Sequence, residues 1–435
     1  MIKKVIRKIN KGDNKNIFSN FVSLSFLQGA NLILPLITFP YLVRILGIEK
    51  YGLLMFAQAF MAYFSLIADY GFNLSGTREV SLNRNNIAKL SRIYNSILFA
   101  RIGLTILGFI IMALIVFSID KFTLDWKLYF LTYGMIIGNA LFPIWFFQGM
   151  EKMKYITILS VISKLIFTIL IFVFVSSSDD YLWVPLINAG GSVFFGVVAL
   201  IIINRQFNIP FRIQKIKYIL QQLQMGWYVF ISKISTNLYT ATTTFVLGMV
   251  ANNTMVGYYV VAEKAIRIII AMFIPFTQAI YPNTVQLAKK SPEEAMVLIR
   301  KILKYTLIIT ICIWLIVVIL AEPLFHMVFG HDVDHSIILF RTLSLLIIVL
   351  PIAVILFNII LLSFKMDKYF FKIYMFGAIL NIFLLGFFLF ILDLSTIGAA
   401  LSLLICELSI TLYAIALLNK MKFKLFSFDF NKISF

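Results

Sequence analysis

The chain has 435 residues, of which 61% are hydrophobic and 13% are charged, and its mean hydropathy is +0.96. This composition excludes an ordinary soluble globular domain and indicates a membrane protein. The formal net charge of +19 would suit nucleic-acid binding. The basic residues lie mainly in short segments between apolar runs, however, so we expect no nucleic-acid partner.

Apolar runs of about 20 residues recur along the chain, and each is long enough to cross a hydrocarbon core of about 30 Å. About twelve runs can be distinguished: 18–43, 51–71, 94–118, 128–149, 155–176, 182–204, 226–250, 256–282, 303–328, 336–363, 369–392 and 396–419. The runs are continuous rather than alternating, and backbone in lipid must satisfy its own hydrogen bonds. The sequence therefore predicts an all-α integral membrane protein with about 12 transmembrane helices.

The loop charges predict the topology. A basic stretch, 1–17, precedes the first run, which is too long for the core of a signal peptide and is expected to remain as an uncleaved helix. With this stretch inside, the outer loops hold few basic residues, namely Arg44, Lys50, Lys121 and Lys127. The bias predicts that both termini are cytoplasmic. The inner basic loops are expected to contact membrane lipids.

The segment 205–225 follows six of the predicted helices and divides the chain. We expect an N-lobe at 18–204, this linker, a C-lobe at 226–419 and a basic cytoplasmic tail at 420–435. The two six-helix lobes would surround a central cavity.

A short internal repeat supports the two lobes. Residues 51–59 (YGLLMFAQA) and 256–264 (VGYYVVAEK) share glycine and alanine at the same spacing, and Gln58 aligns with Glu263. Six runs separate the copies, so both cross the membrane in one direction. Parallel repeats of this kind place a substrate site between the halves.

Six cations lie inside apolar runs: Arg101, Lys164, Lys233, Lys264, Arg267 and Arg341. Each costs about 2.5–3.5 kcal/mol at the centre of a membrane helix, so most are expected to face a watery cavity. Such a cavity is suited to an anion.

Four stretches resemble the bacterial polysaccharide flippases, specifically the O-antigen (Wzx-type) transporters. They are 34–47 (LPLITFPYLVRILG), 70–74 (YGFNL), 143–154 (PIWFFQGMEKMK) and 278–282 (QAIYP). The likeness covers nearly the whole chain, with the motifs in the same order.

The resemblance implies the multidrug/oligosaccharidyl-lipid/polysaccharide exporter fold, which alternates between inward- and outward-open states. The implied substrate is an undecaprenyl-pyrophosphate-linked oligosaccharide carried to the outer leaflet, without a cofactor. Proton or sodium coupling is open, as is a complex with a polysaccharide polymerase or a chain-length regulator.

Several other functions share parts of this pattern. A teichoic-acid or capsule-unit exporter would use the same fold, and so would a drug or metabolite antiporter, although cationic drugs should favour acidic cavities. A lipid II flippase typically has fourteen helices. A membrane enzyme acting on lipid-linked sugars usually needs a large outer loop, and here every outer loop is short. We therefore expect a transporter and not an enzyme.

Ten residues are the candidates for function. The substrate-binding candidates are Arg44, Arg101, Lys164, Lys233, Lys264 and Arg267. The candidates for ion coupling or gating are Asp69, Arg78, Glu263 and Glu407.

Structural interpretations of these residues stay open. Glu263 and Arg267 are four residues apart on a helix, where an internal ion pair is easy. Arg44 and Arg341 lie near the ends of runs, where long basic side chains reach the interface. Asp69 and Arg78 would equally suit an ordinary turn. Arg101 and Lys164 would equally suit packing against polar neighbours or snorkelling. Glu407 would equally suit neutralising a nearby cation.

No metal site is predicted. Cys312 and Cys406 lie within runs and offer no disulfide or zinc framework. The segment 331–335 (HDVDH) contains two histidines and two aspartates. It forms a short outer loop, where polar residues are expected in any case.

Overall fold

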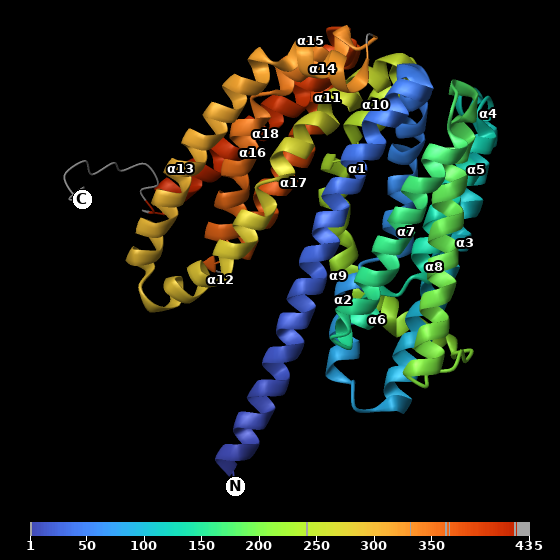
Figure 1. Ribbon diagram of the computed structural model, residues 1–435, viewed down its shortest axis with the longest axis vertical. Helices are drawn as coiled ribbons and strands as arrows, with labels where there is room; N and C mark the ends of the chain where they lie inside the picture. Colours follow the sequence, from blue (N-terminus) through green and yellow to red (C-terminus); the bar gives the residue numbers. More distant parts are fainter. Residues whose placement is uncertain are drawn as a thin grey trace. The chain divides into compact units, whose positions relative to one another are not determined.

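The computed structural model describes residues 2–240, 242–330, 332–361, 363–364, 366–421 and 423. Every regular element in these ranges is helical (Figure 1). The all-α prediction is therefore confirmed. Contacts divide the chain into two compact units: unit 1 is Met1–Asn237 and unit 2 is Leu238–Phe435.

Unit 1 contains the first part of the chain. Its elements are α1 (Ile2–Asp69), α2 (Phe72–Leu82), α3 (Ile87–Ser118), α4 (Asp120–Thr123), α5 (Trp126–Leu141), α6 (Ile144–Gly149), α7 (Met153–Phe174), the 3-10 helix η1 (Ser178–Leu182), α8 (Trp183–Gln206) and most of α9 (Ile216–Thr240). The sequence predicted the lobe division at 205–225, whereas the units meet at 237/238, because α9 packs with the N-terminal helices up to that point. The lobe boundaries themselves stay a prediction.

Unit 2 contains the remaining helices. They are α10 (Thr242–Val250), α11 (Asn253–Ala271), α12 (Ile274–Lys290), α13 (Pro292–Ile319), α14 (Ala321–Phe329), α15 (Asp334–Leu343), α16 (Leu346–Val354), the π-helix η2 (Ile355–Leu361), α17 (Asp367–Gly386), the π-helix η3 (Phe387–Ile391) and α18 (Ser395–Lys420). Several begin at side-chain caps. Asn252, for example, accepts from the amide of Met255 at the start of α11, and Ser291 accepts from that of Glu294 at the start of α13.

Eight helices of the described residues are long and apolar enough to span a membrane, or nine if the bent pair Asp334–Leu343 and Leu346–Leu361 is one span. The predicted number was about twelve. Two predicted runs merge into one candidate, Phe26–Leu82, because α1 continues through a kink at Gly47 (φ 74°, ψ 165°).

The predicted runs 226–250 and 256–282 are not among these candidates. In the second, α11 carries Glu263, Lys264 and Arg267 within five positions. The following helix, α12, has only 17 residues. The second region falls short because α11 is charged and α12 is short. Charged residues and broken helices inside a membrane protein mark functional segments more often than surface ones.

In unit 1, α5 and α8 run side by side (Figure 1). A Cβ added to Gly138 would lie 2.4 Å from the carbonyl carbon of Ser192, so only glycine permits this approach. The 143–154 motif also proves to be structural. Its aromatic residues Trp145, Phe146 and Phe147 on α6 are fully buried in the core of the unit.

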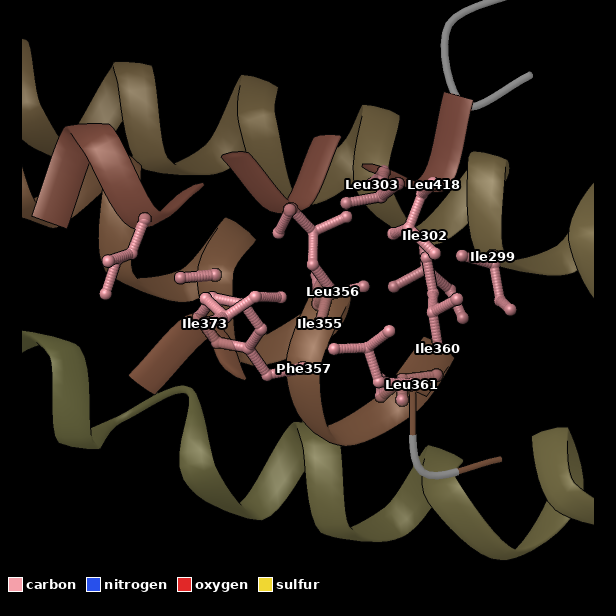
Figure 2. Packing of buried hydrophobic residues seen from close by; sticks show 14 of the residues in the cluster. Ile299, Ile302, Leu303, Ile355, Leu356, Phe357, Ile360, Leu361, Ile373 and Leu418 are labelled. Atoms are coloured by element: carbon pink, nitrogen blue, oxygen red, sulfur yellow. The ribbon is translucent and has the colours of Figure 1, made fainter. Parts of the chain in front are cut away.

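The core of unit 2 forms where α13, η2, α17 and α18 meet, and Figure 2 shows its aliphatic side chains interdigitating. Ile299, Leu356 and Leu418 are completely buried there. Cys406 is buried in the same cluster and donates to the carbonyl of Gly377 at 3.2 Å. Within the described residues, Cys312 and Cys406 form no disulfide.

Candidate functional site

A sharp turn between α1 and α2 begins the site. Tyr70 (φ 42°) and Gly71 (φ 76°) both adopt left-handed backbone, which glycine tolerates and tyrosine does not favour. A Cβ at Gly71 would lie 2.7 Å from Cγ1 of Val229. The turn therefore leaves Asp69 at the end of α1, directly against α9.

One face of α9 is shaped to meet this turn. A Cβ at Gly226 would lie 3.1 Å from the carbonyl oxygen of Tyr70, and the rings of Tyr70 and Phe230 stack with centroids 4.5 Å apart. Residues 226, 230 and 233 share one helix face. This register brings Nζ of Lys233 to 2.5 Å from Oδ2 of Asp69.

Arg101 reaches the same carboxylate from α3. Its Nη2 lies 3.8 Å from Oδ1 of Asp69 and donates to the carbonyl of Asn139 at 2.9 Å, while Nη1 donates to that of Phe142 at 3.4 Å. These carbonyls are accessible because Pro143, which has no N–H, ends the helix α5. Arg101 is only 4% exposed and is thus held in a fixed position.

The three charged groups line a cavity of about 510 Å³. Its other lining residues are Ala62, Ser65, Leu66, Ala68, Asn73, Ile136, Asn139, Ala140 and Ile144. We call this cavity the charged pocket. Two cations face one carboxylate, so the pocket has a formal excess of one positive charge.

Several buried polar atoms of the charged pocket have no hydrogen-bond partner among the described residues. They are Nε of Arg101, Oδ1 of Asp69 and Oδ1 of Asn73. Buried polar atoms are normally satisfied, so donors and acceptors are left over for a ligand or water. An anion that enters would compete with Asp69 for both cations.

The sequence analysis named Arg101 and Lys233 as substrate-binding candidates and Asp69 as a coupling or gating candidate, and the structure brings the three together in the charged pocket. Their roles stay predictions. Asn73 and Asn139 were missed as lining residues. A signal for Asn139 existed, because it is an amide within the apolar run 128–149.

The other unit 1 candidates lie outside the lining of the charged pocket. Lys164 on α7 hydrogen-bonds to the side chain of Asn31 on α1. Arg44 and Arg78 are exposed residues of α1 and α2. The gating role of Arg78 and the substrate roles of Arg44 and Lys164 stay predictions.

Unit 2 holds a separate charged cluster on α11 and α18. Both Nε and Nη2 of Arg267 lie 2.7 Å from Oε1 of Glu263, which forms the internal ion pair that the four-residue spacing allowed. Glu407 is 5% exposed and lies near enough to act electrostatically on Arg267. Lys264 is half-buried on the same helix as the pair.

The charged and histidine residues of 322–341 form pairwise contacts. Arg341 lies 3.5 Å from Glu322, with both side chains exposed. His326 lies 3.3 Å from Asp334, and His335 hydrogen-bonds to Thr396. His331 lies outside the described residues. Within the described residues, no three metal-ligating side chains form a group.

The fold defines a class of protein, the multi-pass α-helical membrane proteins. The chain matches a solved lipid II flippase, MurJ in an inward closed conformation, over 93% of its own length and 87% of that chain, with a TM-score of 0.72 at 17% identity. It also matches an inward-facing multidrug resistance transporter of the MATE family and MOP superfamily, over 93% and 99% of the two chains, with a TM-score of 0.67 at 12% identity. These likenesses concern the fold.

Sequence comparison identifies the family. The profile described as "Polysaccharide biosynthesis protein" matches residues 17–288. A protein of Escherichia coli (strain K12) named "Putative O-antigen transporter" is 30% identical over 400 residues, which cover 90% of this chain and 94% of the relative. A protein of the same name from Shigella dysenteriae is 27% identical over 394 residues, covering 91% and 98%.

The chain therefore belongs to this polysaccharide biosynthesis family. The resemblance to polysaccharide flippases is confirmed, and so is the prediction of a transporter rather than an enzyme.

Proposed function

We propose that the protein moves an undecaprenyl-pyrophosphate-linked oligosaccharide from the inner to the outer leaflet by alternating access. The relatives named as O-antigen transporters and the fold shared with a lipid II flippase support lipid-linked saccharides as the substrate class. The diphosphate would bind in the charged pocket.

The observation that carries this proposal is the sharing of one carboxylate by two cations in a cavity of about 510 Å³. Arg101 offers a fixed guanidinium fork, which suits phosphate oxygens, and Lys233 offers a movable point charge. Asp69 then serves as a resident anion that holds both cations in place until a diphosphate displaces it.

Displacement of Asp69 would also break an ion pair that joins two helices. The pair Asp69–Lys233 joins the end of α1 to α9, next to the stacked rings of Tyr70 and Phe230. A diphosphate that takes Lys233 from Asp69 weakens this connection, and a conformational change of α9 would follow. Substrate binding and the alternation of access are coupled in this way.

A complementation experiment tests the proposal. Cells that lack their own flippase receive the wild-type gene or Lys233→Ala, Arg101→Lys or Asp69→Asn, and long-chain surface polysaccharide is measured at matched membrane levels. Lys233→Ala should abolish the polysaccharide, with lipid-linked units accumulating inside. Arg341→Ala is the control, because that exposed cation lies outside the charged pocket.

The outcomes separate the alternatives. If cells with Lys233→Ala and cells with Arg101→Lys both make normal amounts of polysaccharide, the charged pocket takes no part in transport. Failure of the wild-type gene to restore any polysaccharide, with drug resistance gained instead, would favour the drug or metabolite antiporter. The kind of polysaccharide recovered would distinguish O-antigen units from capsule or teichoic-acid units.

The remaining roles belong to the same proposal. Glu407, buried on α18, would carry a coupling proton or sodium ion, with Glu263 and Arg267 as its charged neighbours. Lys264 would add a further contact to the anionic head. The protein would lie in the bacterial inner membrane with both termini cytoplasmic, open to a polymerase or chain-length regulator as partner.

A further inference from the structure

Unit 1 contains a second polar cavity, also of about 510 Å³, formed by α2, α3 and α9. Its lining residues are Glu79, Asn83, Lys89, Arg92, Ile93, Ser96, Tyr218, Gln221, Gln222, Gln224 and Met225. We call it the amide pocket. Neutral hydrogen-bonding side chains are the largest group in its wall, whereas half of the lining residues of the charged pocket are apolar.

The amide pocket has unused hydrogen-bonding capacity. The side chains of Gln221, Gln222 and Gln224 make no hydrogen bond to another described residue. Gln221 and Gln224 are exposed and Gln222 is half-buried, so these amides are hydrated and can exchange water for a ligand. Ser96 is completely buried, and its hydroxyl also has no partner in the described part of the chain. Each glutamine offers two donors and one acceptor, which is the capacity that vicinal hydroxyl groups require.

The charges of the amide pocket are arranged for weak electrostatic binding. Lys89 and Arg92 are exposed and Glu79 lies beside them, so water and salt screen their fields. The guanidinium of Arg92 is occupied with the ring of Tyr218, 4.9 Å from its centroid. Hydrogen bonding rather than charge must therefore decide what binds.

Both pockets are lined in part by residues of α3 and α9. Ser96 and Arg101 are five positions apart on α3, and Gln222 and Lys233 are eleven apart on α9. At 1.5 Å per residue these separations are about 8 and 16 Å along the helix axes. An oligosaccharide joined to a diphosphate can bridge this distance. On α9, Phe230, whose ring stacks on that of Tyr70, lies between Gln222 and Lys233 in the sequence.

We propose that the amide pocket recognises the saccharide of the lipid-linked substrate, as a hydroxyl-rich ring bound by Gln221 and Gln222 before translocation. This inference rests on the proposed function and adds the group that selects the sugar. The charged pocket would bind the diphosphate, which all such lipids share. The amide pocket would bind the sugar, which differs between them.

The test measures binding of two lipids to the full chain in nanodiscs of zwitterionic phospholipid. One is undecaprenyl diphosphate, and the other is the undecaprenyl-diphosphate-linked saccharide purified from the bacterium that carries the gene. The wild type should bind the glycosylated lipid more tightly. Gln221→Ala/Gln222→Ala should lower that affinity about ten-fold, because it removes two or more hydrogen bonds. It should leave the bare diphosphate unaffected.

A matched control comes from the same segment. Gln214 lies outside the amide pocket and donates to the carbonyl of Arg212. Gln214→Ala should bind both lipids as the wild type does. Equal affinity of the wild type for both lipids, or unchanged affinities in Gln221→Ala/Gln222→Ala, would overturn the sugar site. Equal weakening for both lipids would also overturn it, because the change would then concern the diphosphate or the fold.

A further variant separates this inference from the proposed function. Lys233→Ala should weaken the binding of both lipids to the same extent, since both carry the diphosphate. If Lys233→Ala binds both lipids normally while the glutamine variant loses only the glycosylated one, the diphosphate site is wrong and the sugar site stands. If the reverse holds, the charged pocket stands and the sugar site is wrong.

Discussion

The charged residues of the two units are partnered in different ways. In unit 1, Asp69 is held by cations from two other helices, Arg101 on α3 and Lys233 on α9. In unit 2, Arg267 is held by Glu263 one turn away on the same helix. A pair within one helix stabilises that helix alone, whereas a carboxylate shared between helices fixes their relative position. Under the proposed function, only the second kind would transmit ligand binding to the fold.

The largest effect should come from Arg101→Ala. The change removes two hydrogen bonds to the end of α5 and leaves Asp69 with one partner. Breaking a buried pair in this way typically costs about 3–5 kcal/mol. Thermal unfolding in detergent should show a clear loss. Arg101→Lys should be intermediate, because it keeps the charge and loses the fork. An unchanged unfolding temperature in Arg101→Ala would contradict the anchoring role.

Lys233→Ala should affect transport much more than stability. Lys233 is 30% exposed, so its pair with Asp69 contributes little to folding, about 1 kcal/mol or less. Export of polysaccharide should fall at least ten-fold at normal membrane levels. Lys233→Arg should retain most export. A loss of stability as large as that of Arg101→Ala would show that both cations are structural.

Gly71→Ala tests how the turn positions Asp69. The added Cβ meets a positive φ and the side chain of Val229 at 2.7 Å, so strain and a clash combine. The left-handed backbone alone should cost about 1–2 kcal/mol. Gly103→Ala on α3 is the control, because its φ is not positive and an added Cβ has nothing within 4 Å. Unfolding in detergent should show a larger loss for Gly71→Ala. Equal losses would mean that α9 does not depend on the close approach.

The smallest effect should come from Glu263→Gln. A pair four residues apart stabilises a helix by about 0.2–0.5 kcal/mol, and Arg267 remains half exposed. Unfolding should hardly change. Transport should fall only if Glu263 takes part in coupling, which the exchanged pair Glu263→Arg/Arg267→Glu would test further. A loss of several kcal/mol would show that unit 2 also uses its charges to join helices.

Much of the fold followed from the sequence. Long apolar runs predicted the helical membrane protein, and the pair Glu263–Arg267 could be anticipated because its spacing is local. The number of spans was less predictable. Whether α1 continues through Gly47, and whether α11 and α12 form one span, depends on packing that hydropathy does not contain.

The sequence by itself determined the class of protein, the family motifs and the residue types of the site. Only the tertiary structure decided which cations share a carboxylate. Asp69 and Lys233 are far apart in the chain, and they meet because the Tyr70–Gly71 turn and the glycine of α9 allow two backbones to approach. The tertiary structure also places three glutamines of the predicted linker 205–225 in the wall of the amide pocket. Periodicity reveals which face a residue shares with its neighbours in sequence. The partner across that face depends on contacts between distant helices.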